Sequence, residues 1–326
     1  MSGKFLIAMD ELIFAGVELY GVIRYNRMFH YYLRWARRAK ARTPSLARPI
    51  TLNDKYYFRK ALDHSPLHVT LSDKLATKDW LKQYFPDIAV PKTFWSDVSL
   101  EGLPEDFLGQ NAVLKSNHSS GHIIFLNEPG LTLAEVKRRA QNWLTSKHWK
   151  RYSEWAYSKV PPRYFVEEMI GTFGQHPLEA KVYTFGNQVT TSLYIQKQKE
   201  GRAMDIFTHQ NDGTTKLAPH LAVVSDKRLG LEKAPPQNAL AIAMKVGSML
   251  DHVRVDLYEV GRSYIFGEAT LYNLGGNFGV VSTDPYDGNT VAWDITKSWF
   301  FQNKQNWFWE VYKSAYFRWA YRQQTL

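Results

Sequence analysis

The stretch "VRVDLYEVGRSYIFGEATLYNLGG", residues 253–276, carries an Asp and a Glu on two consecutive apolar runs. Apolar and polar residues alternate up to Gly261 and then resume, which is the pattern of two strands joined by a glycine-containing turn. Such a hairpin would bring Asp256 and Glu268 together on paired strands. Two carboxylates in a half-buried sheet repel each other unless something positive lies between them. The hairpin therefore indicates either arginine or lysine partners or a divalent metal.

The composition describes a globular chain with an excess of basic residues. It has 326 residues, 44% hydrophobic and 22% charged, enough for two or three domains or one large α/β unit. There is no cysteine, which excludes disulfides, thiolate zinc sites and thiol catalysis. A net charge of +10 favours an acidic partner such as a nucleotide, an acidic glycan, a nucleic acid or an anionic membrane.

Helical and strand-like patterns alternate irregularly along the chain. Helices are expected over residues 1–40, 72–85, 131–150, 235–250 and 297–322, with Ser72 or Asp73 and Thr132 as N-caps. Strands are expected in "NAVLKSNHSSGHIIFL", "PRYFVEEMIG", "LEAKVYTFGNQVTTSLYI" and the 253–276 hairpin. Antiparallel hairpins mixed with helices predict an α+β, or mixed α/β, fold. The first helical segment is interrupted by acidic residues before it reaches a membrane-spanning length.

Lys115 ends an apolar run and enters the polar loop "SNHSSGH", residues 116–122. A lysine at this place could bind phosphate together with loop N–H groups, or it could be solvated beside an ordinary hairpin loop. His118 and His122 are four residues apart, but the Ser-Ser-Gly between them disfavours a helix that would align them as metal ligands.

Two further charged pairs lie on predicted strands. Glu167 and Glu168 are adjacent, so only one of them can face a given site. Glu167 is the candidate to accept a hydrogen bond from an exocyclic amine of a ligand. Glu179 and Lys181 share a strand face, where they form either a surface ion pair or a site at which Lys181 faces phosphate. Each pattern alone is as consistent with a solvated surface as with a site.

Both termini combine basic and aromatic residues. The run Arg34–Arg42 is basic and the tail 297–322 is aromatic. The simpler interpretation is a solvated face and a packed helix, and the alternative is contact with an anionic membrane.

Taken in order, five blocks resemble the ATP-grasp superfamily, and most closely its TupA-like branch, which is associated with polysaccharide and teichuronopeptide biosynthesis. The blocks are "SDKLATKDWLKQYFPDIAVPKTFW", "VLKSNHSSG", "WKRYSEWAYSKVPPRYFVEEMI", "EAKVYTFGNQV" and "VRVDLYEVGRSYIFGEATL". The resemblance covers roughly residues 50–295. Two departures are visible: Thr270 stands where many members have a metal-binding Asn, and "NLGGNFG" replaces a proline-containing stretch. The second departure leaves acceptor specificity open.

The resemblance implies an ATP-grasp fold, with the nucleotide held between two α+β subdomains and helical extensions at both ends. It implies that Lys115 and Lys181 bind the ATP phosphates and are catalytic, together with His118. The implied nucleotide-binding residues are Lys115, Ser119, Ser120, Gly121, Glu167, Glu168, Met169, Ile170 and Lys181. The implied ligands of Mg²⁺, with Mn²⁺ as an alternative, are Asp256 and Glu268, with Asn273 or Thr270 in place of the usual Asn.

The implied reaction is ATP-dependent joining of a carboxylate to an amine through an acyl phosphate, on a uronic-acid-containing surface glycan or its precursor. A glycan phosphotransferase and a non-catalytic membrane- or glycan-binding protein are the alternatives. Nucleic acid is not an expected partner, because no recognition motif accompanies the charge. The expected location is cytoplasmic, with peripheral contact at the inner face of the membrane as an option.

Five segments are expected. They are a basic helical extension (1–50), an N-terminal subdomain (51–105), small and large ATP-grasp subdomains (106–175 and 176–296), and an aromatic helix (297–326).

Overall fold

The protein is described here from a computed structural model, in which residues 3–38, 40, 42–174, 176–197, 201–210, 212–218, 227–231, 233–276 and 288–325 are placed. Residues 1, 2 and 39 of the expected first helix lie outside these ranges, as do 277–279 of the glycine-rich segment. The chain forms two compact units. Unit 1 contains Met1–Ser65, Tyr152–Trp155 and Tyr272–Leu326, and unit 2 contains Pro66–Arg151 and Ala156–Leu271. The finer division into five segments stays a prediction.

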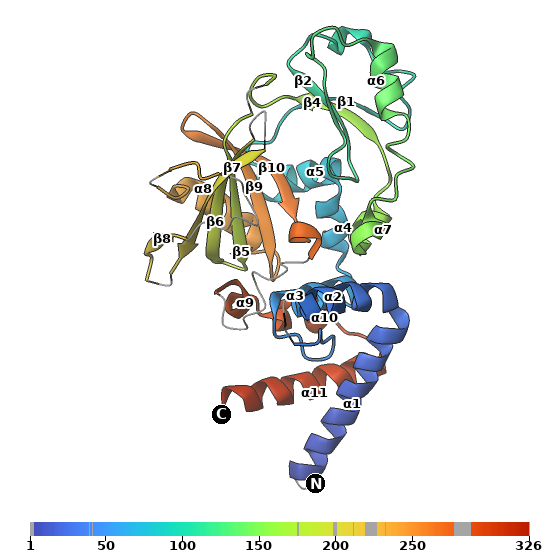
Figure 1. Ribbon diagram of the computed structural model, residues 1–326, viewed down its shortest axis with the longest axis vertical. Helices are drawn as coiled ribbons and strands as arrows, with labels where there is room; N and C mark the ends of the chain where they lie inside the picture. Colours follow the sequence, from blue (N-terminus) through green and yellow to red (C-terminus); the bar gives the residue numbers. More distant parts are fainter. Residues whose placement is uncertain are drawn as a thin grey trace. The chain divides into compact units, whose positions relative to one another are not determined.

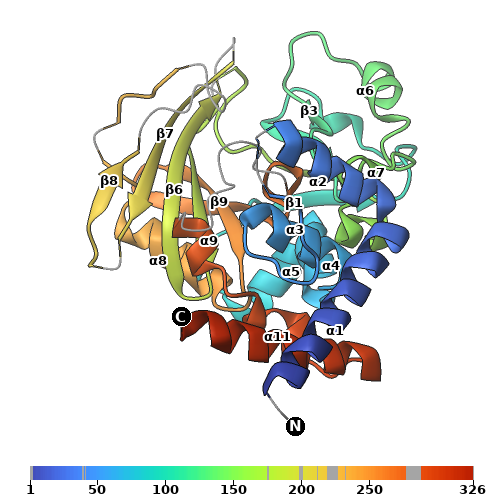
Figure 2. The same ribbon diagram turned by 60° about the horizontal axis from the view of Figure 1, so that its bottom comes forward.

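Unit 1 is helical and joins the two ends of the chain. Its helices are α1 (Gly3–Arg24), α2 (Asn26–Arg38), α3 (Leu52–Ala61), α9 (Gly288–Ala292), α10 (Trp299–Gln302) and α11 (Trp307–Gln324). Helix α1 crosses α11 in both views (Figures 1 and 2), and Phe14 meets Tyr312 edge to face with ring centroids 6.4 Å apart. One face of the aromatic tail, which contains Tyr312 and Tyr316, is therefore packed in the core of unit 1, whereas Trp307 and Tyr321 are exposed.

The segment expected as one helix over 297–322 is two helices in the structure. The break falls at residues 303–306, and α11 begins after Asn306, whose side chain accepts a hydrogen bond from the backbone N–H of Trp309. An asparagine in this role satisfies a backbone donor that the first helical turn leaves unpaired, so it favours a new start over continuation.

Unit 2 contains every strand that the structure describes, arranged in two antiparallel sheets. The four-stranded sheet has the order β1-β4-β2-β3, formed by β1 (Thr93–Asp97), β2 (Ala112–Ser116), β3 (Ile123–Phe125) and β4 (Tyr164–Glu168). Helix α6 (Leu133–Ala140) contributes Val136 and Ala140 to the same buried cluster as Leu114 and Val166 of this sheet. Its N-cap is Thr132, as predicted, but α6 ends at Ala140 and not near residue 150. A short helix, α7 (Trp149–Tyr152), follows.

The six-stranded sheet has the order β10-β9-β5-β6-β7-β8. Its strands are β5 (Glu179–Phe185), β6 (Gln188–Lys197), β7 (Arg202–His209), β8 (Thr215–Leu217), β9 (Val253–Val260) and β10 (Ser263–Thr270). Helix α8 (Gln237–Gly247) packs on it so closely that a Cβ at Gly247 would lie 2.6 Å from Cβ of Thr184. Helices α4 (Pro66–Ser72) and α5 (Lys74–Tyr84) complete the unit, with Asp73 as the N-cap of α5. The mixed α+β class expected from the sequence is confirmed.

Candidate functional site

Three charged side chains are aligned across the β10 edge of the six-stranded sheet. Lys181 on β5 is paired with Asp256 on β9, which is paired in turn with Glu268 on β10. Residues directly opposite each other on neighbouring strands share a face, so all three side chains belong to one side of the sheet. A bulge at Gly267 separates Glu268 from the regular register that precedes it. The hairpin predicted from residues 253–276 therefore forms and brings the two carboxylates together.

Asp256 is buried between two cations. Its Oδ2 accepts from Nζ of Lys181 at 2.5 Å, and Nε and Nη2 of Arg254 donate to its two oxygens at 2.6 and 2.8 Å. Burial by itself would raise the pKa of Asp256, but Arg254 and Lys181 hold it below its usual value. Glu179 also accepts from Lys181, at 2.8 Å. The carboxylate is therefore ionised at neutral pH, as a metal ligand must be.

Glu268 lies at the rim of the same site. Its side chain is about one-third exposed, and Oε1 is 4.0 Å from Nζ of Lys74 at the start of α5. The same ammonium donates to the backbone carbonyl of Ser119 at 2.7 Å. Lys74 thus connects the polar loop after β2 with the second carboxylate.

A second buried carboxylate, Glu167 on β4, is also held by two lysines. Its Oε1 accepts from Lys115 of β2 and its Oε2 from Lys78 of α5, each at 2.5 Å. Burial opposes ionisation, yet the two ammoniums lower the pKa of Glu167 below its usual value. Burial lowers the pKa of Lys78, and Glu167 partly offsets this. The neighbouring Glu168 is exposed and accepts from the backbone N–H of Lys92.

Tyr258 on β9 has charged neighbours from both sheets. Burial raises the pKa of its phenol, Lys115 from one sheet and Lys181 from the other lower it, and Glu179 and Glu167 raise it. The charged side chains that line a narrow cavity of unit 2 are Lys74, Lys78, Lys115, Glu167 and Glu268. This cavity joins Glu268 to the Glu167 group, and strand pairing joins Glu268 to Asp256 and Lys181. The charged residues of the two sheets therefore form one connected group within unit 2.

The segment after β4, expected to contact adenine, is fixed by Asn111. The backbone N–H of Met169 donates to the carbonyl of Asn111, and the Asn111 amide donates to the carbonyls of Met169 and Gly171 at 3.0 and 3.1 Å. The N–H of Met169 is thus already used, so of Met169 and Ile170, which the resemblance implies as nucleotide-binding residues, Ile170 is the one left to donate a backbone N–H.

The residues of the loop expected to bind phosphate differ in their exposure to solvent. Ser119 is buried, while Ser120 and Gly121 are exposed, and Gly121 has a φ of +80° that favours glycine. His118 is buried beneath the loop, and burial lowers its pKa, which favours a neutral ring. The exposed backbone of residues 120–121 is suited to an anion, whereas a catalytic role for His118 stays a prediction.

The two residues proposed in place of the usual metal-binding Asn lie in different units. Thr270 is in unit 2, where its hydroxyl accepts from Nη2 of Arg254 at 3.0 Å. Asn273 is in unit 1, fully buried, and its amide donates to the hydroxyl of Tyr56 at 2.7 Å. Asn273 therefore has a structural partner of its own, and Thr270 belongs to the same unit as Asp256.

Sequence reasoning did not assign Lys74, Lys78 or Arg254 to the site. A signal existed for the two lysines, because a spacing of four residues on a helix places both on one face. A signal existed for Arg254 as well, since residues two apart on a strand share a face with Asp256.

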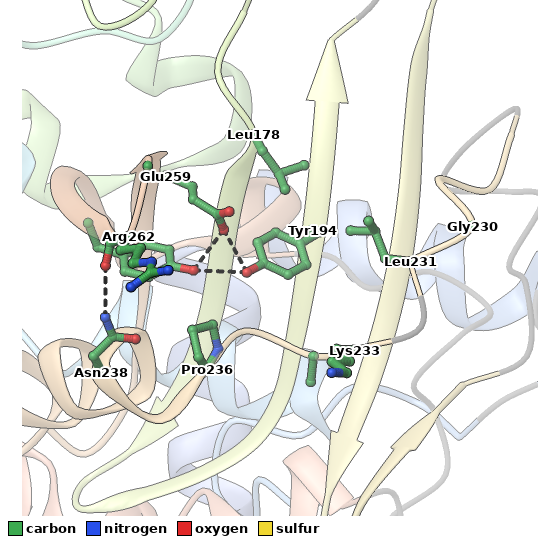
Figure 3. Close-up of a pocket in the computed structure, with 12 residues that line it drawn as sticks. Leu178, Tyr194, Gly230, Leu231, Lys233, Pro236, Asn238, Glu259 and Arg262 are labelled. Atoms are coloured by element: carbon green, nitrogen blue, oxygen red, sulfur yellow. Dashed lines mark hydrogen bonds between the residues drawn. The ribbon is translucent and has the colours of Figure 1, made fainter.

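A larger cavity lies elsewhere in unit 2, on the other face of the six-stranded sheet. It measures about 660 Å³, and at its centre Glu259 accepts hydrogen bonds from the hydroxyls of Tyr194 and Tyr264 at 2.8 and 2.7 Å (Figure 3). Glu259 is three residues from Asp256 on one strand, so the two side chains point to opposite faces. This cavity is larger than the one lined by Lys115 and Glu268, but the lysines and carboxylates converge on the smaller one. The smaller cavity is therefore the candidate functional site.

Comparison with known proteins supports an assignment to a family. No curated protein matches the chain. Similar solved structures include D-alanine–D-alanine ligase from Bacillus anthracis with ATP (13% identity, 62% of this chain and 55% of that one, TM-score 0.35). They also include the ATP-grasp ligase PsnB with a minimal precursor (14%, 64% and 55%, 0.33) and N5-carboxyaminoimidazole synthase from Aspergillus clavatus (13%, 62% and 44%, 0.34). The chain spans about half the length of these proteins.

The family model described as TupA-like ATPgrasp matches residues 54–291, well over half of the chain. That range includes both sheets and all the lysines and carboxylates of the site. The expectation drawn from the five sequence blocks is thereby confirmed: the chain belongs to the TupA-like ATP-grasp family.

Proposed function

We propose that this protein is an ATP- and Mg²⁺-dependent ligase that joins a carboxylate to an amine. The observation that carries the proposal is the alignment of Lys181, Asp256 and Glu268 on one sheet face, where Glu268 also lines a cavity with Lys115. A polyanionic triphosphate needs clustered cations, and a metal that bridges its oxygens needs ionised carboxylates beside them. Membership of a ligase family supports the same conclusion.

The chemistry of the donor set fits Mg²⁺. Asp256 and Glu268 offer hard carboxylate oxygens on adjacent strands, and the low pKa of Asp256 keeps it ionised. Thr270 would be the additional oxygen donor, and Mn²⁺ could take the same ligands. When bound, the metal would supply charge neutralisation at the phosphate oxygens.

The side chains of the site suit the two steps of such a reaction. In the first, a carboxylate oxygen attacks the terminal phosphorus of ATP, and the bond to ADP breaks. In the second, the amine attacks the acyl carbon, phosphate leaves, and the nitrogen loses a proton. Lys115 and Lys181 would hold and orient the phosphates, and Arg254 would stabilise charge on the transferred group. The loop of residues 119–121 would exclude water.

Nucleotide binding would require the site to open. The cavity measures about 20 Å³, whereas small-molecule sites usually have about 300 Å³ or more. Glu167 would then exchange part of its contact with Lys78 and Lys115 for the adenine amine, which releases the two ammoniums toward phosphate.

The substrate class follows from charge and family. A net charge of +10 favours an acidic acceptor, and we propose a uronic-acid-containing glycan or its precursor, joined to an amino acid or another amine.

The test is ADP release measured with and without each substrate, using a glycan carboxylate labelled with heavy oxygen. The expected result is ADP formation that needs both carboxylate and amine, with one labelled oxygen transferred to phosphate. Lys181→Met should abolish it, while Lys245→Met, at an exposed pair with Asp87, should not. A phosphorylated glycan without an amide would instead establish a phosphotransferase and contradict the proposal.

A further inference from the structure

Helix α1 of unit 1 presents an apolar face that none of the described residues covers. Phe5, Met9, Leu12, Leu19 and Ile23 are exposed, from 42% for Met9 to 74% for Leu12. Their spacings of four, three, seven and four residues put them on one stripe of the helix. Figures 1 and 2 show α1 at the edge of unit 1, with its N-terminal end extending beyond α11. Contiguous exposed apolar surface of this kind marks an interaction site.

The acidic residues of α1 are all bound by partners within unit 1. Asp10 is buried and forms ion pairs with two arginines of α11 at 2.5 and 2.9 Å. Glu11 pairs with Arg48 at 3.0 Å, and Glu18 accepts hydrogen bonds from residues 45–47. Each of these carboxylates is therefore neutralised, and none is left to repel an anionic surface.

Helix α2, which follows α1 directly in the chain, carries positive charge on its exposed face. Arg27, Arg34 and Arg38 are exposed at positions i, i+7 and i+11, which share one face, while Met28 and Tyr32 are buried on the other. The sequence of α2 contains no acidic residue. Hydrogen bonds from the N–H of residue 25 to the carbonyl of residue 21, and from 29 to 25, carry helical bonding from α1 into α2.

We propose that α1 and α2 bind the surface of an anionic lipid bilayer. The apolar stripe of α1 (Phe5, Met9, Leu12, Leu19 and Ile23) enters the acyl region, and the arginines of α2 contact lipid phosphates. At 1.5 Å per residue, the 22 residues of α1 give about 33 Å of helix lying in the interface. No helix among the described residues has the length and hydropathy to cross the bilayer. This inference does not depend on the ligase chemistry.

A bilayer fits the apolar stripe better than a second copy of the chain. A two-helix coiled coil buries a narrow seam and places charged residues beside it. The positions flanking the stripe on α1 are instead Ala8 and Ala15 on one side, which are exposed, and Ile13 and Tyr20 on the other, which are half-buried. The apolar surface is therefore broad, as expected for a helix that lies on lipid.

The test is co-sedimentation of the full-length protein with vesicles of phosphatidylcholine, alone or mixed with phosphatidylglycerol. The wild-type protein should bind the mixed vesicles and bind less as salt increases. Leu12→Glu combined with Leu19→Glu should lower the partition coefficient by at least about tenfold. Leu217→Glu, at an exposed leucine of β8 in unit 2, should bind like the wild type.

Two further measurements decide the interpretation. Arg34→Gln with Arg38→Gln should remove the preference for phosphatidylglycerol. An unchanged thermal midpoint of the double glutamate variant would show that this variant folds. ATP turnover is measured in a separate assay, so a protein without ligase activity would still test whether α1 and α2 bind lipid. The proposal is overturned if the wild-type protein binds neither kind of vesicle, or if the glutamate variant binds vesicles as well as the wild type does. It is also overturned if the protein binds no lipid and instead forms a dimer that Leu12→Glu dissociates.

Discussion

Replacing Asp256 with Asn removes the negative charge between Lys181 and Arg254. The change is nearly isosteric, so it tests charge and not shape. Three charge-assisted hydrogen bonds are affected, with N–O distances of 2.5, 2.6 and 2.8 Å. An amide keeps one oxygen acceptor, but its nitrogen takes the place of an oxygen that accepts from at least one of the two cations, and it cannot accept.

The expected loss of stability follows from burial. Removing one partner of a buried ion pair costs about 3–5 kcal/mol, since a charge is left without compensation. Lys181 retains Glu179 at 2.8 Å, and Arg254 retains the hydroxyl of Thr270 at 3.0 Å. We therefore expect the lower end, about 3 kcal/mol. The difference in the free energy of unfolding between the wild type and Asp256→Asn should be largest at neutral pH. It should shrink as the pH falls below 3.8, because the folded-state pKa of Asp256 is lowered and protonation of Asp256 removes the same charge.

The assay is urea unfolding followed by tryptophan fluorescence, with and without ATP and Mg²⁺. A ligand at one hundred times its Kd stabilises a protein by about 2.7 kcal/mol, and Asp256→Asn should lose most of that gain together with ATP turnover. Asp87→Asn, at an exposed pair with Lys245, should leave unfolding and turnover unchanged.

Two results would refute this reasoning about Asp256. A loss of less than about 1 kcal/mol would show that the pair behaves like an exposed one and that Asp256 does not hold the two cations together. ATP turnover at the wild-type rate would show that Asp256 is not a ligand of the catalytic metal.

Three further predictions concern the surroundings of the site. Lys78→Met should raise the KM for ATP about tenfold by removing a charge-assisted contact, whereas Lys82→Met, exposed on the same helix, should not; steady-state kinetics would contradict this if both variants behave alike. Burial lowers the pKa of His122 to about 4, so the unfolded chain binds a proton that the folded protein does not, and Tm should fall as pH decreases from 6.5 to 4. His122→Phe should flatten that part of the Tm profile, and an unchanged slope would assign it to other groups. Gly267→Ala would place a Cβ 2.9 Å from the ring of Tyr258, so we expect slower ATP turnover with lower Tm, and wild-type values of both would show that the bulge tolerates a side chain.

Local pattern was sufficient to predict the hairpin that carries the carboxylates. Alternation along 253–260 and 263–270, with Gly261 at the turn, predicted the two strands, but not the bulge at Gly267 that places Glu268 opposite Asp256. The cap at Thr132 was likewise visible in the sequence, because an N-cap depends on only a few neighbouring residues. The length of α6 was not predicted correctly from the sequence, because tertiary packing as well as periodicity sets where a helix ends.

The sequence by itself determined the family, the hairpin that carries Asp256 and Glu268, and the residue types needed to bind a triphosphate and a metal. Only the tertiary structure decided which cation neutralises which carboxylate. Lys181 lies beside Asp256 because β5 is the neighbour of β9, although the two residues are 75 positions apart. Lys78 reaches Glu167 from a helix 89 positions earlier. Alternation specifies the face of a strand, whereas the partner across that face depends on sheet order, which long-range packing selects.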